Sequence, residues 1–114
     1  MLIDTVINAV FYASQEAKQV LRELNVGDKL MLVPEPNNEF DPNAVQVKAF
    51  DSDGNEQVLG YIPRIGKNKE SLSEKVTAEI LKGTLLEAIF NGGYKITVQS
   101  PGSEKVNFNK LGVF

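Results

Sequence analysis

One stretch of the chain, EPNNEFDPNAVQV at residues 35–47, gathers side chains that could do chemistry. It places the carboxylates of Glu35, Glu39 and Asp41 around one phenylalanine, Phe40. Paired carboxylates can carry out acid–base catalysis when burial raises the pKa of one of them. An enzyme would also need a nucleophile with a base beside it, and the chain contains no histidine and no cysteine. The stretch therefore favours a binding loop over a catalytic centre.

The same loop is predicted to be stiff. Pro36 and Pro42 fix their own φ angles and bias Glu35 and Asp41, which precede them, toward extended geometry. The three asparagines of the loop can hydrogen-bond nearby backbone and stabilise turns. A stiff loop loses little entropy when a ligand binds to it. Two interpretations stay open on these residues alone: Phe40 plugs the end of the core while Asp41 caps the next turn, or both line a ligand pocket.

A second group of candidate residues begins in LGYIPR, residues 59–64. Tyr61 and Arg64 lie here, and Lys67 and Lys69 follow shortly before a predicted helix, whose N-terminal dipole also favours anions. Ordinary surface charge at the start of a helix would explain the two lysines equally well. The net charge is −3, so a strongly basic coat is absent and any binding to phosphates must be local.

Other site types are not favoured. Asp51, Asp53 and Glu56 look like part of a calcium loop, but they join two predicted strands, and DSDG is a typical hairpin turn. No metal or cofactor is expected. No apolar run approaches the ~20 residues of a membrane helix, and the N-terminus lacks the basic start of a signal peptide. We therefore expect a cytoplasmic protein with no membrane partner.

The elements that must position these residues follow from periodicity. Alternating and β-branched runs predict strands, apolar stripes at helical spacing predict helices, and Asn91-Gly92-Gly93 predicts a second hairpin turn. The predicted strands cover residues 3–12, 28–35, 44–50, 57–64, 84–90 and 94–100, and the tail EKVNFNKLGVF is a candidate last strand. The predicted helices cover 15–24 and 71–82. Residues 1–114 are thus expected to form one mainly β domain, a small OB-like antiparallel β-barrel with one or two packed helices.

Helix ends carry their own signals. Ser14 is the expected N-cap of the first helix, and Gly27 follows where that helix should stop. Ser71 and Glu74 have the spacing of a capping box at the start of the second helix, and Gly83 suits its C-terminal stop.

Together, EPNNEFDPNAVQV and LGYIPR resemble the HIRAN domain family, which is named for its place at the N-terminus of helicase-like chromatin and repair proteins. Both blocks of the family motif are present in order, and the resemblance covers residues 3 to about 90. It implies a compact β-barrel related to the OB-fold with a helix packed on it. It also implies binding of single-stranded DNA at its 3′-hydroxyl end, and a helicase or nuclease as a possible partner protein.

The resemblance also implies roles for individual residues. Phe40 matches the loop aromatic that stacks on a base, and Asp41 matches the acid that meets the 3′-hydroxyl. Arg64 matches a residue that contacts phosphate, and Tyr12 matches the second aromatic. The family's glycine before that aromatic is Ala9 here, and the loop aromatic, often tyrosine, is phenylalanine. The predicted nucleic-acid-binding residues are Tyr12, Phe40, Asp41, Tyr61, Arg64 and Lys67.

Three functions are compared on this basis. The leading one is a non-enzymatic module that binds single-stranded DNA and prefers 3′-hydroxyl ends, as the Phe40-Asp41 and Arg64 constellation indicates. The alternative is a protein–protein interaction module on the same fold without DNA binding, which the acidic net charge favours. The weakest is a small hydrolase acting on nucleic-acid ends.

Overall fold

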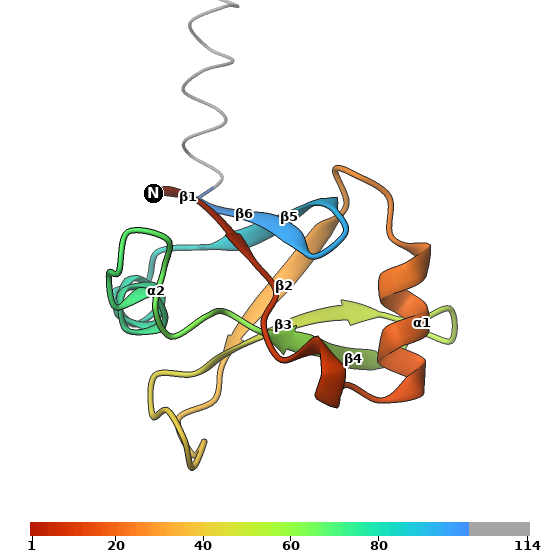
Figure 1. Cartoon of the computed structure of the whole chain (residues 1–114), viewed down its shortest axis with the longest axis horizontal. Helices are drawn as coiled ribbons and strands as arrows, with labels where there is room; N and C mark the ends of the chain where they lie inside the picture. The colour runs from red at the N-terminus through yellow and green to blue at the C-terminus, as the bar shows by residue number, and fades with distance from the viewer. Residues whose placement is uncertain (101–114) are drawn as a thin grey trace, which may run out of the picture.

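The computed structural model describes residues 1–100 and shows a mainly β architecture with helices at either side (Figure 1). The tail proposed as a last strand lies outside the described residues. The strands are β1 (Leu2–Val6), β2 (Lys29–Pro34), β3 (Val45–Phe50), β4 (Glu56–Tyr61), β5 (Glu87–Gly92) and β6 (Lys95–Gln99). The helices are η1 (Val10–Tyr12, a 3₁₀ turn), α1 (Gln15–Glu23) and α2 (Leu72–Leu81). None of these helices is long and apolar enough to cross a lipid bilayer.

The six strands form one antiparallel sheet in the order β1-β6-β5-β2-β3-β4. β2 belongs to both halves of this sheet, because Lys29 and Leu30 pair with β5 while Met31 to Pro34 pair with β3. The sheet therefore bends along β2, which sets β1, β6 and β5 above β3 and β4 in Figure 1. α1 packs beside β4, and α2 lies at the opposite side of the molecule.

The expected β-barrel is not found closed within residues 1–100, because the strand ladder stays open between β1 and β4. One isolated bridge spans this opening: Asn8 N–H donates to the Tyr61 carbonyl at 2.7 Å, and Tyr61 N–H donates to the Asn8 carbonyl at 2.9 Å. Gly60 permits this approach, since a Cβ placed there would lie 2.3 Å from the Asn8 carbonyl oxygen. The glycine of LGYIPR is thus required where the chain after β1 meets β4.

The core lies between the folded sheet and the inner faces of both helices. β3 shows the predicted alternation, with Val45, Val47 and Ala49 buried and Gln46 and Lys48 on the outer face. The largest fully buried apolar side chains are Leu59, Leu72, Ile96, Val45, Val47, Val76 and Val98. These come from both halves of the sheet and from α2, so one core holds the two halves and α2 together.

The first predicted strand is too long. It ends at Val6, and η1 occupies Val10–Tyr12 instead. The turn begins at Ala9, which has φ 61° and ψ 23°, the left-handed region where glycine is at ease and alanine is not. Tyr12 therefore projects from a helical turn beside β4 rather than from the end of a strand.

The two α helices begin in different ways. Ser14 caps α1 as predicted, since its Oγ accepts the Ala17 N–H at 3.0 Å. The predicted capping box at Ser71 is wrong, because the Ser71 side chain makes no cap hydrogen bond. The N–H of Leu72 donates instead to the Arg64 carbonyl at 2.9 Å, which satisfies an amide at the start of α2 with backbone.

Both predicted hairpins are confirmed. β3 and β4 are joined through the DSDG turn, where Gly54 has φ 83°. β5 and β6 are joined around Gly92 and Gly93, which both have positive φ. In the first turn the Asp51 carboxylate accepts N–H groups of Asp53 and Asn55. Hydrogen bonds from the Gln57 side chain and then from backbone hold the pKa of Asp51 below its usual value. Among residues 1–100 no three acidic side chains are grouped closely enough to hold a metal ion.

Candidate functional site

The loop between β2 and β3, residues 35–44, is held by its own side chains. Asn38 Oδ1 accepts the N–H groups of Phe40 and Asp41, both at 2.9 Å. Asp41 Oδ1 accepts the Asn43 N–H at 2.8 Å, and the Glu35 N–H donates to the Ala44 carbonyl at 2.8 Å across the neck of the loop. These bonds fix the backbone on both sides of Phe40, so the loop has the internal restraint that its sequence predicts.

Phe40 does not plug the core, since 85% of the residue is exposed. The interpretation in which Phe40 plugs the end of the core is therefore wrong. The part of it in which Asp41 caps the next turn is correct, because the Asp41 carboxylate accepts the Asn43 N–H.

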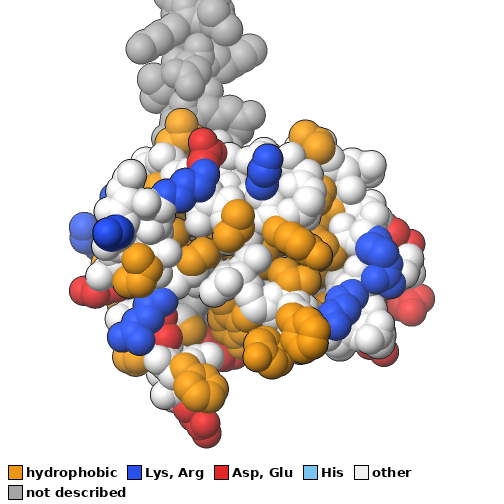
Figure 2. Space-filling view, in the orientation of Figure 1, with side chains coloured by type: hydrophobic (Ala, Val, Ile, Leu, Met, Phe, Trp, Pro, Cys, Tyr) orange, Lys and Arg blue, Asp and Glu red, His pale blue; other side chains and the backbone are white. Residues whose placement is uncertain are grey.

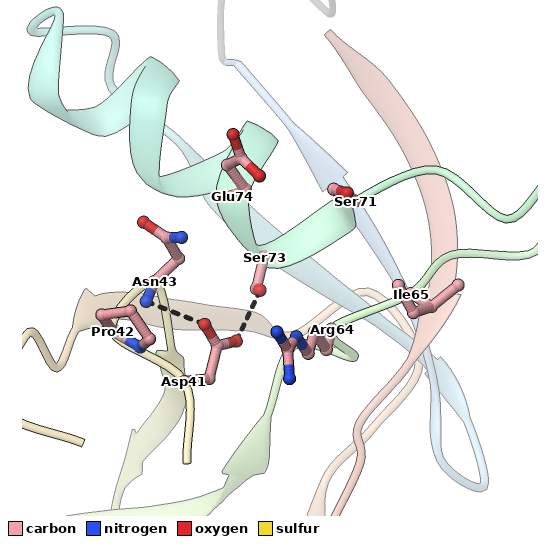
Figure 3. Close-up of a pocket in the computed structure, with 8 residues that line it drawn as sticks. All are labelled: Asp41, Pro42, Asn43, Arg64, Ile65, Ser71, Ser73 and Glu74. Atoms are coloured by element: carbon pink, nitrogen blue, oxygen red, sulfur yellow. Dashed lines mark hydrogen bonds between the residues drawn. The ribbon is translucent and has the colours of Figure 1, made fainter. Parts of the chain in front are cut away.

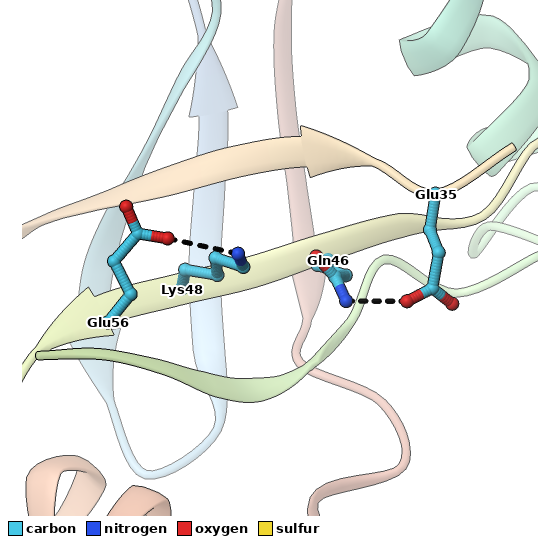
Figure 4. Close-up of polar contacts among 4 residues, drawn as sticks. All are labelled: Glu35, Gln46, Lys48 and Glu56. Atoms are coloured by element: carbon cyan, nitrogen blue, oxygen red, sulfur yellow. Dashed lines mark hydrogen bonds and ion pairs between the residues drawn. The ribbon is translucent and has the colours of Figure 1, made fainter.

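Glu35 joins the loop to the sheet. Its carboxylate accepts hydrogen bonds from the side chains of Asn38 at 2.7 Å, Gln46 at 2.5 Å and Tyr61 at 3.1 Å. Figure 4 shows the contact with Gln46 on the outer face of β3. Burial is the main cause that raises the pKa of Tyr61, and the Glu35 carboxylate raises it further. The phenol therefore stays protonated and acts as a donor to Glu35, which ties β4 to the base of the loop.

The loop is also tied to α2. Ser73 Oγ donates to Asp41 Oδ2 at 2.7 Å, and Thr77 Oγ1 donates to the Asn43 carbonyl at 2.8 Å. Figure 3 shows the Asp41 carboxylate between Ser73 and Asn43, with the Arg64 guanidinium beside it. Ser73 and Thr77 are one helical turn apart and both buried, so one face of α2 sets the position of Asp41.

A cavity of about 640 Å³, here called the central cavity, lies between the loop and η1. Figure 2 shows hydrophobic side chains on both sides of a hollow in this part of the surface. The central cavity is lined by Asn8, Ala9, Tyr12, Asn38, Phe40, Asp41, Ala44, Tyr61, Ile62 and Arg64. Five of the six predicted site residues therefore converge on one concave surface, although they come from three separate segments of the chain.

Lys67 is the exception. It is exposed and does not line the central cavity. The turn that carries it is closed by the Gly66 N–H, which donates to the Glu70 carbonyl at 2.9 Å, and by the Asn68 N–H, which donates to Glu70 Oε2 at 2.9 Å. The sequence shows that a basic residue follows Arg64, but the direction of its side chain depends on this turn.

Two further cavities adjoin the central one. The first, the α2 cavity, has a volume of about 450 Å³ and shares Asp41 and Arg64 with it. The second, the β4 cavity, also has a volume of about 450 Å³ and shares Ala9, Tyr12 and Tyr61 with it. The three cavities thus form a continuous band from the start of α2 to the outer face of β4.

The chemistry available in the central cavity is binding. Tyr12 and Phe40 offer exposed rings, and the Arg64 guanidinium makes no ion pair with a carboxylate of residues 1–100. The Asp41 carboxylate receives two hydrogen bonds from protein groups, and a carboxylate has roughly four acceptor positions. It can therefore accept a further hydrogen bond from a ligand while it holds the loop.

Sequence reasoning missed several residues of this site. The sequence indicates Asn38 only as one of three turn-forming asparagines, yet it orients the backbone of Phe40 and Asp41 and also lines the cavity. Ser73 carried a signal that could have been used, since a serine inside a helix has to place its hydroxyl somewhere. Asn8 has no local signal, because only its bridge with Tyr61 brings it to the cavity. Ile62 lies within LGYIPR but is not among the predicted site residues.

Comparison with known proteins agrees with this architecture. Residues 3–77 match the model of the HIRAN domain family, so the match covers more than half of the chain. The fold is similar to the crystal structure of the HIRAN domain of human HLTF, with a TM-score of 0.61 and 15% sequence identity over 92% of this chain and 81% of that one. No curated protein sequence matches the chain significantly. On the family match, the chain belongs to the HIRAN domain family, whose domain is a non-catalytic binding module.

Proposed function

We propose that this chain binds the free 3′-hydroxyl end of single-stranded DNA in the central cavity. The observation that carries the proposal is the convergence on a single concave surface of two exposed aromatic rings, one carboxylate and one guanidinium that makes no ion pair within residues 1–100. Stacking surfaces, a hydroxyl acceptor and a phosphate partner are the groups that a terminal nucleotide requires.

The aromatic residues supply affinity that does not depend on base sequence. Every base has a π-face, and stacking on an aromatic side chain contributes ~1–3 kcal/mol per base. Phe40 is 85% exposed and Tyr12 is 86% exposed, so both rings are free to stack. The hydrogen bonds of Asn38 hold the backbone of Phe40 before a ligand arrives, which lowers the entropy lost on binding.

Asp41 supplies the preference for an end. A carboxylate repels the phosphates of an internal backbone, but it accepts a hydrogen bond from a terminal hydroxyl. Ser73 and the Asn43 N–H fix its orientation at the edge of the cavity. A strand with a 3′-phosphate would bring at least one further negative charge to this carboxylate and should bind more weakly.

Arg64 supplies a local positive charge in an acidic chain. A site that grips one terminus contacts few phosphates, so it does not need an overall positive charge. The net charge of −3 is therefore compatible with end binding, although it would disfavour a long track of nonspecific backbone contacts.

The test is fluorescence anisotropy with 5′-labelled single strands that differ only at the 3′ end, measured at low salt, about 50 mM, where screening is weakest. We expect the 3′-hydroxyl strand to bind severalfold more tightly than the 3′-phosphate strand. A covalently closed single-stranded circle, which has no end, should compete poorly. If no single strand binds under these conditions, the proposal is wrong.

Asp41→Asn is the matched variant for end selectivity. The amide oxygen can still accept the Asn43 N–H, so the loop should keep its shape. The variant loses the negative charge, and we expect hydroxyl and phosphate ends to bind it with similar affinity. If the wild type itself binds both ends equally, Asp41 has no role in selecting them.

Two observations favour a second function, a protein–protein interaction module on the same fold. The net charge of −3 disfavours a polyanionic ligand, and the exposed Phe40 and Tyr12 would also suit an apolar partner segment. This function becomes the better account if the protein binds no single strand at low salt.

A further inference from the structure

The β4 cavity lies next to the proposed end-binding site and has no role in it so far. Its lining residues are Ala9, Tyr12, Ala13, Ser14, Glu56, Gln57, Val58, Gly60 and Tyr61. Tyr12 lines this cavity and the central cavity and is 86% exposed, so its side chain forms a wall between the two. Tyr61 lines both as well, which makes the two cavities neighbours along one surface.

Tyr12 also contacts the aromatic residue that precedes it in the chain, Phe11. The Phe11 ring packs against it in an edge-to-face arrangement, with centroids 5.5 Å apart and planes at 86°. Lys18 Nζ lies 5.5 Å from the centroid of the Phe11 ring, so a positive charge is present close to this aromatic pair. An aromatic pair with a nearby cation suits a chain of bases joined by phosphates.

A strand whose 3′ end is held at Asp41 leaves the central cavity on its 5′ side, where the two adjoining cavities offer it a protein surface. The α2 cavity is lined by the carboxylates of Asp41 and Glu74 and by the Arg64 guanidinium. Asp41 and Arg64 also line the central cavity, so the charge that this exit adds is Glu74, which makes no ion pair within residues 1–100. The β4 cavity adds the carboxylate of Glu56, and Lys48 pairs with it at 3.0 Å (Figure 4). The β4 cavity is therefore the exit with less repulsion toward a phosphodiester chain.

We propose that the β4 cavity is a second base-binding subsite, which takes the nucleotide on the 5′ side of those in the central cavity. This inference rests on the proposed function and extends it, because it turns a pocket for a terminus into a track that passes Tyr12. The base in this subsite lies against Tyr12 and contacts Val58. Any base can occupy it, because stacking provides most of the affinity.

The test is a length series of 5′-labelled oligonucleotides with a 3′-hydroxyl end, from two to six nucleotides, bound to the wild type and to Val58→Phe. Val58 lines the β4 cavity but not the central one, and phenylalanine keeps a strand-compatible side chain while it fills the space. We expect the two proteins to bind the shortest strands equally. At one added nucleotide the wild type should gain roughly 5- to 150-fold, the range for one stacked base, and Val58→Phe should not.

Two controls assign the effect to this cavity. Val58→Thr keeps the volume and should follow the wild type at every length. Ser71→Phe fills the α2 cavity, which does not share Ser71 with the others, and should also follow the wild type. If Ser71→Phe abolishes the gain and Val58→Phe does not, the strand leaves through the α2 cavity and the inference is overturned.

A second measurement does not depend on any variant. Strands with 2-aminopurine at successive positions from the 3′ end should show changed fluorescence on wild-type binding at one position beyond those held in the central cavity. If the wild type binds all lengths equally and the signal stops at the central cavity, the β4 subsite is rejected while end binding stands. If no strand binds at any length, the proposed function itself fails.

Discussion

Phe40 and Asp41 are adjacent in the chain but meet different demands. Phe40 leaves a large apolar ring in water, which a fold does not select for its own stability. Asp41 is tied into the loop and to α2 by hydrogen bonds and is needed for structure whether or not a ligand binds. A substitution at Phe40 therefore reports on binding, whereas one at Asp41 has to be checked for folding as well.

Phe40→Ala should weaken single-strand binding by ~1–3 kcal/mol, the contribution of one stacked base. The dependence of affinity on salt should stay nearly unchanged, because stacking releases no counterions. Anisotropy titrations at several salt concentrations measure both quantities, and circular dichroism melts check that the loop is still folded. A variant with wild-type affinity would exclude Phe40 from the interface.

Arg64→Ala should change the salt dependence of binding, which Phe40→Ala leaves nearly unchanged. The loss of one phosphate contact on a single strand lowers the slope of log affinity against log salt by about 0.7. Affinity should fall at low salt for all sequences, since a phosphate contact carries no base information. Lys75→Ala, at an exposed position of α2 outside the central cavity, is the matched loss of charge. An equal change of slope in both variants would mean that Arg64 acts only through the net charge.

Ala9→Gly should stabilise the protein. Ala9 has φ 61°, a left-handed conformation that costs alanine about 1–2 kcal/mol and costs glycine little. Part of this gain is lost because glycine makes the unfolded chain more flexible, so we expect a net increase of about 0.5–1 kcal/mol in the free energy of unfolding. Urea denaturation measures it. The reverse result, a less stable variant, would show that the Ala9 methyl group packs too well to be lost.

At the scale of elements, α2 acts as a support for the loop. Ser73 and Thr77 direct their hydroxyl groups to Asp41 and to the Asn43 carbonyl, so loop and helix form one polar joint. This joint explains why a buried face of α2 carries a serine and a threonine where apolar residues would otherwise be expected.

Ser73→Ala should lower the free energy of unfolding by about 1 kcal/mol, since a hydrogen bond to a charged group is lost but the carboxylate is partly exposed and regains water. End selectivity should fall too, because Asp41 loses one of the two groups that orient it. Thermal melts and anisotropy with hydroxyl and phosphate ends measure the two effects. Ser71→Ala is the control, since the Ser71 side chain makes no cap hydrogen bond at α2.

The elements that the sequence predicts correctly are those set by local chemistry. The alternation of β3, the DSDG turn, the Ser14 cap and the stop at Gly83 all depend on residues within one or two turns of each other. The failures depend on distant contacts. Strand 3–12 breaks where Asn8 meets Tyr61, and at the start of α2 the Ser71 side chain makes no cap hydrogen bond while the distant Arg64 carbonyl accepts the Leu72 N–H.

The site was predictable to the extent that it lies in two contiguous motifs. The loop and LGYIPR supply most of the central cavity, and their residue types indicate binding rather than catalysis. Asn8 and the β4 cavity were not predictable, because they depend on how the open sheet brings its two ends together. Whether the sheet closes fully is set by its bend along β2, and no local pattern specifies that bend.

At the scale of the whole molecule, the described chain carries its candidate binding groups on one band across three cavities. The net charge of −3 disfavours long-range attraction of a polyanion to the molecule as a whole. A nucleic acid should therefore be drawn to this band through short-range contacts and show a shallow salt dependence, unlike a protein that follows a duplex with many phosphate contacts.

The single bridge between Asn8 and Tyr61 has a kinetic consequence. Two hydrogen bonds hold the chain that carries Tyr12 to β4, and within residues 1–100 no further bridge joins these two segments, although Tyr61 also pairs with Gln46 of β3. Such an isolated contact can open locally without unfolding the core, so its two amides should exchange with deuterium faster than those inside β3. A strand lying across Tyr12 and Tyr61 would hold the bridge shut. Hydrogen–deuterium exchange should then show slower exchange at Asn8 and Tyr61 when oligonucleotide is bound, and unchanged rates there would mean that the bridge does not open or that the ligand does not span it.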